Sequence, residues 1–125
     1  MNKAEQLQRV NDKQAKLLKK LGFNWLTDGY YFLDGEDIDL DDNRNHNAYD
    51  LHYSAPTIAL ALEYIMEEKG IINWVQCDVF HQWTGCYFFN RAQLQTDIYK
   101  TKRDAESALL DELLTLLESI DELGW

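Results

Sequence analysis

Three amphipathic helical patterns alternate along the chain with two groups of short β-type runs, and this alternation decides the fold class. The strongest pattern follows Thr101, where a capping sequence precedes an apolar stripe over residues 105–123. Such a stripe must be buried against another layer. Because Asp28-Gly29 and Asp34-Gly35 favour tight turns, the β-type runs are expected to pair in antiparallel fashion. The sequence therefore predicts an α+β fold in the order α-βββ-α-ββ-α, an α/β/α sandwich in which three helices pack on an antiparallel sheet of about five strands.

The other helices are expected over residues 3–21, which precede Gly22, and after Ser54-Ala55-Pro56, where the pattern ends at Gly70. Strands are expected near residues 23–27, 30–33 and 37–40, and over residues 71–80 and 86–91. The 71–80 run is apolar on both alternating phases, which favours helices on both faces of the sheet. The segment between the last two strands resembles a hairpin with Trp83 at its tip. We expect one domain over residues 1–125, with residues 1–22 as a helix that is peripheral to a 23–125 core.

Ile38 and Leu40 alternate with acidic residues in the third expected strand. A strand would bury the two aliphatic side chains and present the carboxylates to solvent. The following residues 41–47 are polar and are expected to form a flexible loop.

Charge is segregated along the chain, whose formal net charge is -10. Residues 1–22 carry +4, residues 23–68 carry -10, residues 69–103 carry +3 and residues 104–125 carry -7. Binding to a phosphate backbone depends on Lys and Arg, so direct nucleic-acid binding is excluded over most of the surface. The basic N-terminal helix is expected to be solvated and to pair with the acidic segments. Because no long apolar run or signal peptide is evident, we expect a soluble cytoplasmic protein with no membrane contact.

Two groups of residues have the chemistry of metal ligands, but their spacing favours no metal site. His46, Asp50 and His52 form one group, and Cys77, His81 and Cys86 form the other. Zinc sites usually have four ligands at short paired spacings, and neither group provides them. Both cysteines are expected to be reduced core residues.

The acidic run between residues 34 and 42 leaves one metal alternative open. As a calcium loop it lacks the required Gly and the bidentate Glu. As a magnesium site, Asp37, Asp39 and Asp41 could supply oxygen ligands to an enzyme that acts on nucleotides, although no phosphate-binding loop is evident. No pattern identifies a catalytic residue or a cofactor.

A family resemblance covers about residues 49–121. It depends on Tyr53-Ser54 at a helix start, an alanine-bearing helix through Ala59 and Ala61, the turn at Gly70, and Thr101 followed by Ala105 and Ala108-Leu109. The chain resembles the phage α/β/α sandwich domain family, which is found in phages and prophages. That resemblance implies the sandwich fold, an origin in a mobile element and residence in the cytoplasm of a bacterial host, and it transfers no catalytic residues.

These observations predict a small acidic binding protein that is not an enzyme. Its basic host or phage partner would meet the residues Asp34, Glu36, Asp37, Asp39, Asp41, Asp42 and Trp83. The sharpest form of this hypothesis is an inhibitor of a host nucleic-acid-binding or defence protein whose carboxylates mimic phosphates. The alternatives are the divalent-metal enzyme and an assembly protein that oligomerises through its N-terminal helix.

Overall fold

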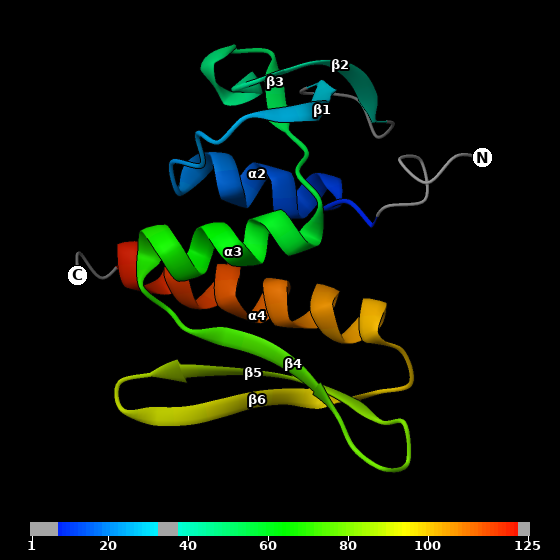
Figure 1. Ribbon diagram of the computed structural model, residues 1–125. Coiled ribbons are helices and arrows are strands. Elements are labelled where there is room, and N and C mark those ends of the chain that lie inside the picture. The colour runs from blue at the N-terminus through cyan, green and yellow to red at the C-terminus, as the bar shows by residue number, and fades with distance from the viewer. Residues whose placement is uncertain (1–7, 33–37, 123–125) are drawn as a thin grey trace. The chain divides into compact units, whose positions relative to one another are not determined.

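The computed structural model describes residues 8–32 and 38–122 and divides the chain into two compact units (Figure 1). One unit is Met1–Thr57 with Leu117–Trp125, and the other is Ile58–Leu116. The described elements are α2 (Asp12–Lys20), β1 (Thr27–Phe32), β2 (Asp39–Arg44), the 3-10 turn η1 (His46–Ala48), β3 (His52–Ser54), α3 (Ile58–Lys69), β4 (Asn73–Cys77), β5 (Trp83–Phe89), β6 (Ala92–Tyr99) and α4 (Lys102–Glu122). Helices and antiparallel strands confirm the predicted α+β class.

The described strands form two three-stranded sheets, with orders β2-β1-β3 and β4-β5-β6, where the sequence predicted one sheet of about five strands. The difference arises because β3 and β6 were not predicted as strands. β3 pairs with β1, and β6 pairs with β5 along nearly its whole length. Each group of three strands therefore forms a separate sheet.

The central strand of the first unit, β1, runs through Gly29, where the sequence predicted a turn between two strands. Ala55 donates its backbone N–H to the carbonyl of Gly29 at 2.8 Å. A Cβ at Gly29 would lie 2.9 Å from Nη1 of Arg9 and 3.2 Å from the backbone carbonyl oxygen of Ala55, so both groups approach this residue closely. Long-range contacts thus override the turn tendency of Asp28-Gly29.

α2 begins at a capping box formed by Asn11 and Gln14, nine residues later than predicted. Residues 8–10 are not helical, because Arg9 forms a β-bridge with Thr57 and Val10 donates its N–H to the carbonyl of Pro56 at 3.0 Å. The expected helix over residues 3–7 lies outside the described residues. The helical pattern in the sequence therefore extends further toward the N-terminus than the helix itself, because residues 9 and 10 pair with another segment instead.

α2 is anchored within the first unit. Ala15 and Leu18 are fully buried, and Nζ of Lys19 donates to the backbone carbonyls of Tyr49 and His52 at 2.9 and 2.8 Å. The apolar side of this helix is consequently part of the core, and that side is not available for a partner helix.

In the second unit, α3 and the residues of α4 up to Leu116 lie on one face of the β4-β5-β6 sheet (Figure 1). Asn73 donates its side-chain N–H to the carbonyl of Leu62 in α3 at 3.2 Å. At Gly85, a Cβ would meet Cβ of Leu109 in α4 at 2.7 Å. A glycine at this position in β5 therefore lets α4 approach the sheet closely.

The long apolar run over residues 71–80 is not a buried strand throughout. β4 ends at Cys77, which is exposed, and the loop that follows presents Val79 and Phe80 with 86% and 78% of their surface exposed. The carboxylate of Asp78 accepts from the backbone N–H groups of Phe80 and Gln82 and holds this loop in place. The C-terminal end of this apolar run is therefore exposed at the surface and is not part of the core.

Of the helix ends predicted after residue 54, the start of α3 was misplaced, whereas the end of α3 and the start of α4 are confirmed. α3 begins at Ile58, because Ser54 still pairs with Tyr30 in the sheet. Gly70 follows α3 with φ +73°, as expected for a residue that ends a helix. Oγ1 of Thr101 accepts the N–H of Asp104 at 3.1 Å, which confirms the capping residue of α4. None of the described helices is long and apolar enough to cross a membrane.

Candidate functional site

The acidic segment lies on β2, an edge strand of the first sheet. Asp39 and Asp41 are exposed, and neither forms an ion pair with another described residue. Leu40 between them is 54% exposed, so the predicted burial of this aliphatic side chain is wrong. An edge strand has a neighbour on one side only, and β2 has an irregular register with β1, which leaves this segment at the surface. Residues 41–44, predicted as a loop, belong to the strand.

The side chains of the other predicted binding residues of this segment lie outside the part of the chain that the structure describes. Asp34, Glu36 and Asp37 lie outside the described residues, and so does the side chain of Asp42. The predicted binding role of these four residues therefore stays a prediction, as does the magnesium alternative, which needs Asp37.

An aromatic and histidine cluster adjoins the exposed carboxylates. Tyr30 stacks on His46 and on His52, with ring centroids 4.6 and 4.1 Å apart. Phe32 packs edge-on against Tyr30 and His52 at 5.4 and 5.1 Å. Tyr49 lies 5.3 Å from His52. Since Asp39 is the register partner of Tyr30, a carboxylate stands beside the stacked rings.

The histidines of this cluster are two of the three residues whose side chains could ligate a metal but whose spacing did not favour a site. His46 and His52 do lie close together, with ring centroids 5.8 Å apart, but Asp50 is an exposed residue of the following turn. Among residues 8–32 and 38–122, no three His, Cys, Asp or Glu side chains are arranged to hold a metal ion. In the second such group, Cys86 is buried whereas Cys77 is exposed. Burial raises the pKa of the Cys86 thiol, and the expectation that Cys77 is a core residue is wrong.

The pKa of His52 is lowered from its usual value of 6.5. Burial is the main cause, and the positive charges of His46, when protonated, and Lys19 act in the same direction. Asp39 and Asp41 oppose this shift, which means that both carboxylates lie within electrostatic reach of the imidazole. His52 therefore favours its neutral form near neutral pH and adds no repulsion toward an incoming cation.

Two cations of the same unit, Arg9 and Lys20, are directed to other partners. Arg9 forms an ion pair with Asp28 at 2.8 Å and donates to the carbonyl of Ala55. Lys20 lies 3.4 Å from Glu118, as expected for a basic helix that pairs with an acidic segment. None of these described pairs includes Asp39 or Asp41, so the acidic surface of β2 is not neutralised by them.

Two predicted features of the second unit are placed differently by the structure. Trp83 is the first residue of β5, half-buried and paired in register with Cys77 and Tyr99, so the prediction that it occupies the hairpin tip is wrong. The tip is the loop that exposes Val79 and Phe80. Trp83 and the β2 carboxylates belong to different compact units.

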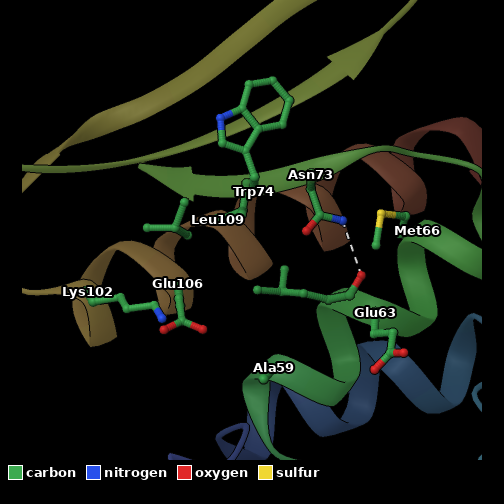
Figure 2. A pocket seen from close by; sticks show the side chains of 10 residues that line it. Ala59, Glu63, Met66, Asn73, Trp74, Lys102, Glu106 and Leu109 are labelled. Carbon is green, nitrogen blue, oxygen red and sulfur yellow. Dashed lines mark hydrogen bonds between the residues drawn. The ribbon is translucent and has the colours of Figure 1, made fainter. Parts of the chain in front are cut away.

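A shallow pocket of about 380 Å³ lies between α3, β4 and the start of α4 (Figure 2). Its apolar side chains include Leu62, Met66 and Leu109, and charged groups of Glu63, Lys102 and Glu106 surround them. In Figure 2 the amide of Asn73 points from β4 toward α3, whereas the ring of Trp74 lies on the other side of the strand. This pocket could not be predicted from the sequence, because its wall residues come from three separate elements.

Comparison with known protein families, curated proteins and solved structures found no significant match to this chain.

Proposed function

We propose that the protein is a small acidic binding protein, not an enzyme, and that it holds a basic partner protein through the exposed edge of the first sheet. The observation that carries this proposal is the exposure of Asp39 and Asp41 on β2 without an ion pair to any described cation. Carboxylates in this position attract Lys and Arg side chains and increase the rate at which a basic protein finds the surface.

The aromatic cluster supports the same partner chemistry. Phe32 and Tyr49, which belong to the ring cluster next to Asp39, are 41% and 45% exposed. Aromatic faces attract cations, and guanidinium groups stack on them while pairing with carboxylates. An Arg-rich surface of the partner is therefore the best match. Nucleic-acid-binding proteins carry patches rich in Lys and Arg, so the target we propose is a nucleic-acid-binding host or defence protein, and a bacterial host is what the resemblance to phage sandwich domains implies.

Affinity capture from bacterial lysate tests the proposal. The wild-type chain should retain a basic protein at low salt and lose it at high salt, because ions screen exposed charges beyond about 8–10 Å. The double variant Asp39→Asn with Asp41→Asn should weaken capture about tenfold or more. A matched control, Glu67→Gln with Asp97→Asn, removes the same charge from exposed residues of the second unit and should retain the partner.

Equal capture by the two double variants would show that the β2 carboxylates do not bind the partner. Capture that persists at high salt would also overturn the electrostatic form of the proposal. Calorimetry distinguishes this proposal from the divalent-metal alternative. An enzyme that uses these acids must bind magnesium or manganese, and the Asp39→Asn, Asp41→Asn variant should lose that binding.

A further inference from the structure

The second sheet has an outer face that α3 and α4 do not cover. Alternation along the strands sends Asn73, Gly85 and Tyr87 toward the helices, as their contacts with Leu62, Leu109 and Glu112 show. The register then assigns nine side chains to the opposite face, which we call the outer face: Ile72, Trp74, Gln76, Thr84, Cys86, Phe88, Gln93, Gln95 and Ile98.

The irregular register between β5 and β6 is included in this assignment. Thr84 pairs with Ile98, whereas Cys86 pairs with Gln95, so β6 has one extra residue between these pairs. Such a bulge reverses the alternation. It brings Ile98 to the outer face, where it is 61% exposed.

The outer face is apolar at its centre. Trp74 and Phe88 lie with ring centroids 5.3 Å apart on neighbouring strands, and Cys86 beside them is fully buried. Ile72 and Phe88 are 55% and 44% exposed. Large exposed apolar side chains gathered on one sheet face mark an interaction surface.

The outer face is also uncharged, and this property indicates what covers it. None of its nine residues, all within the described part of the chain, is Asp, Glu, Lys or Arg, although 27% of the chain is charged. A basic partner would find no carboxylate here. A second copy of a chain with net charge -10 is repelled by most of the surface and can approach closely only where charge is absent.

We propose that the outer face binds the outer face of a second copy, in a two-fold symmetric dimer in which the two β4-β5-β6 sheets pack face to face. Two-fold pairing brings identical patches together, so a surface that is uncharged and apolar in one copy meets the same surface in the other. Aligned sheets pack about 10 Å apart with interdigitating side chains, which suits the Trp74, Phe88 and Ile98 side chains.

The size of the outer face sets the strength of this dimer. Three strands about 4.8 Å apart and about 24 Å long give a footprint of roughly 340 Å² per copy. A stable interface usually buries about 800 Å² per partner. The dimer should therefore be weak and concentration-dependent, and it is independent of the partner proposed above.

Sedimentation of the full chain over a range of concentrations tests the dimer. The average mass should rise from 14.7 kDa toward twice that value as concentration increases. High salt should leave the association unchanged or tighten it, because salt screens the repulsion between the two acidic copies. This response is opposite to the one expected for capture of a basic partner, so the failure of one proposal is distinguishable from the failure of the other.

Two variants place a charge on the outer face without changing the core. Ile98→Lys and Gln95→Glu each alter an exposed side chain and should weaken dimerisation at least tenfold, while thermal melting shows that the fold is retained. The control Leu51→Lys changes a 63% exposed aliphatic residue of the first unit and should dimerise as the wild type does. A chain that stays monomeric at the highest concentration, or folded outer-face variants that dimerise like the control, would overturn the proposal.

Discussion

The two sheets of this protein present opposite kinds of surface. The exposed edge of the first sheet carries Asp39 and Asp41, whereas the outer face of the second sheet carries no charge. Charged side chains on an exposed strand are a common protection against unwanted association with other strands. The outer face of the second sheet has no charged side chains that would protect it from association in the same way. The contrast matches the two proposals, which assign a basic protein to the charged edge in one unit and an uncharged apolar surface to the outer face in the other.

The largest effect we expect separates the two faces of the second sheet. Leu109 is fully buried on α4 and packs toward Gly85, so Leu109→Ala should lower the free energy of unfolding by about 2–5 kcal/mol. Ile98→Ala on the outer face should change it by no more than about 0.5 kcal/mol, because that side chain is already 61% exposed in the monomer. Urea unfolding at a dilute concentration measures both. Similar losses for the two variants would mean that the face assigned as outer is part of the core.

A smaller effect is expected at Gly85 itself. A methyl group there would meet Cβ of Leu109 at 2.7 Å, so Gly85→Ala should cost about 1–3 kcal/mol as the helix is displaced from the sheet. Because Leu109→Gly removes the Cβ that the new methyl group would meet, combining it with Gly85→Ala should cost less than the sum of the two single losses. Strict additivity in a double-mutant cycle would contradict the close packing of α4 on β5.

The helices were more predictable from the sequence than the sheets, because their signals are local. Thr101 and Gly70 act within one turn of the residues that they cap, and both do so in the structure. β6 has no such local signal, since its residues are mostly exposed, half of them are polar, and it is defined by pairing with β5. The start of α2 was misplaced for the related reason that Arg9 is held by Thr57, 48 residues away in the chain.

The candidate site was predictable only in its charge. A run of carboxylates is visible in the sequence, and the exposure of Asp39 and Asp41 follows from like-charge repulsion. The stacking of Tyr30 between two histidines depends on the register of β1 with β3, and it cannot be predicted from the spacing of these residues in the sequence. Trp83 was misplaced because the hairpin turns earlier, at residues 78–82.

The burial of Tyr87 on the covered side of the second sheet should also affect the stability of the protein at alkaline pH. Burial, followed by a hydrogen bond with Glu112, raises the pKa of Tyr87 to about 12. In the unfolded chain this tyrosine ionises near pH 10, so the folded state retains a proton that the unfolded state has lost. Stability contributed by Tyr87 is therefore complete below pH 10 and is lost as the pH rises toward 12. Tyr87→Phe should flatten this part of the stability curve, and an unchanged slope would contradict the burial of the phenol against α4.

The first sheet should respond at the acid end of the pH range instead. The pKa of His52 is lowered in the folded state, mainly by burial, so below pH 6.5 the unfolded chain binds a proton that the folded chain resists. The stability that neutral His52 contributes is complete above pH 6.5 and decreases as the pH falls below it. Four other groups act on this imidazole, namely Lys19, Asp39, Asp41 and His46, so changing any one of them would remove only part of the effect. His52→Gln is therefore the variant that should remove the dependence of stability on pH in this range. A stability profile that His52→Gln leaves unchanged would contradict this assignment.

The smallest effect we expect connects that histidine to the proposed binding surface. Asp39 and Asp41 raise the pKa of His52 against the stronger effect of burial, so Asp39→Asn with Asp41→Asn should lower it further. Proton NMR titration of the imidazole measures the change, and the control Glu67→Gln with Asp97→Asn should leave it unaltered. A basic peptide bound at the carboxylates should lower the pKa of His52 in the same direction, because added positive charge disfavours the imidazolium. His52 therefore reports on occupancy of the β2 edge, and a titration that is insensitive to both carboxylates would place them too far from the aromatic cluster to form one surface with it.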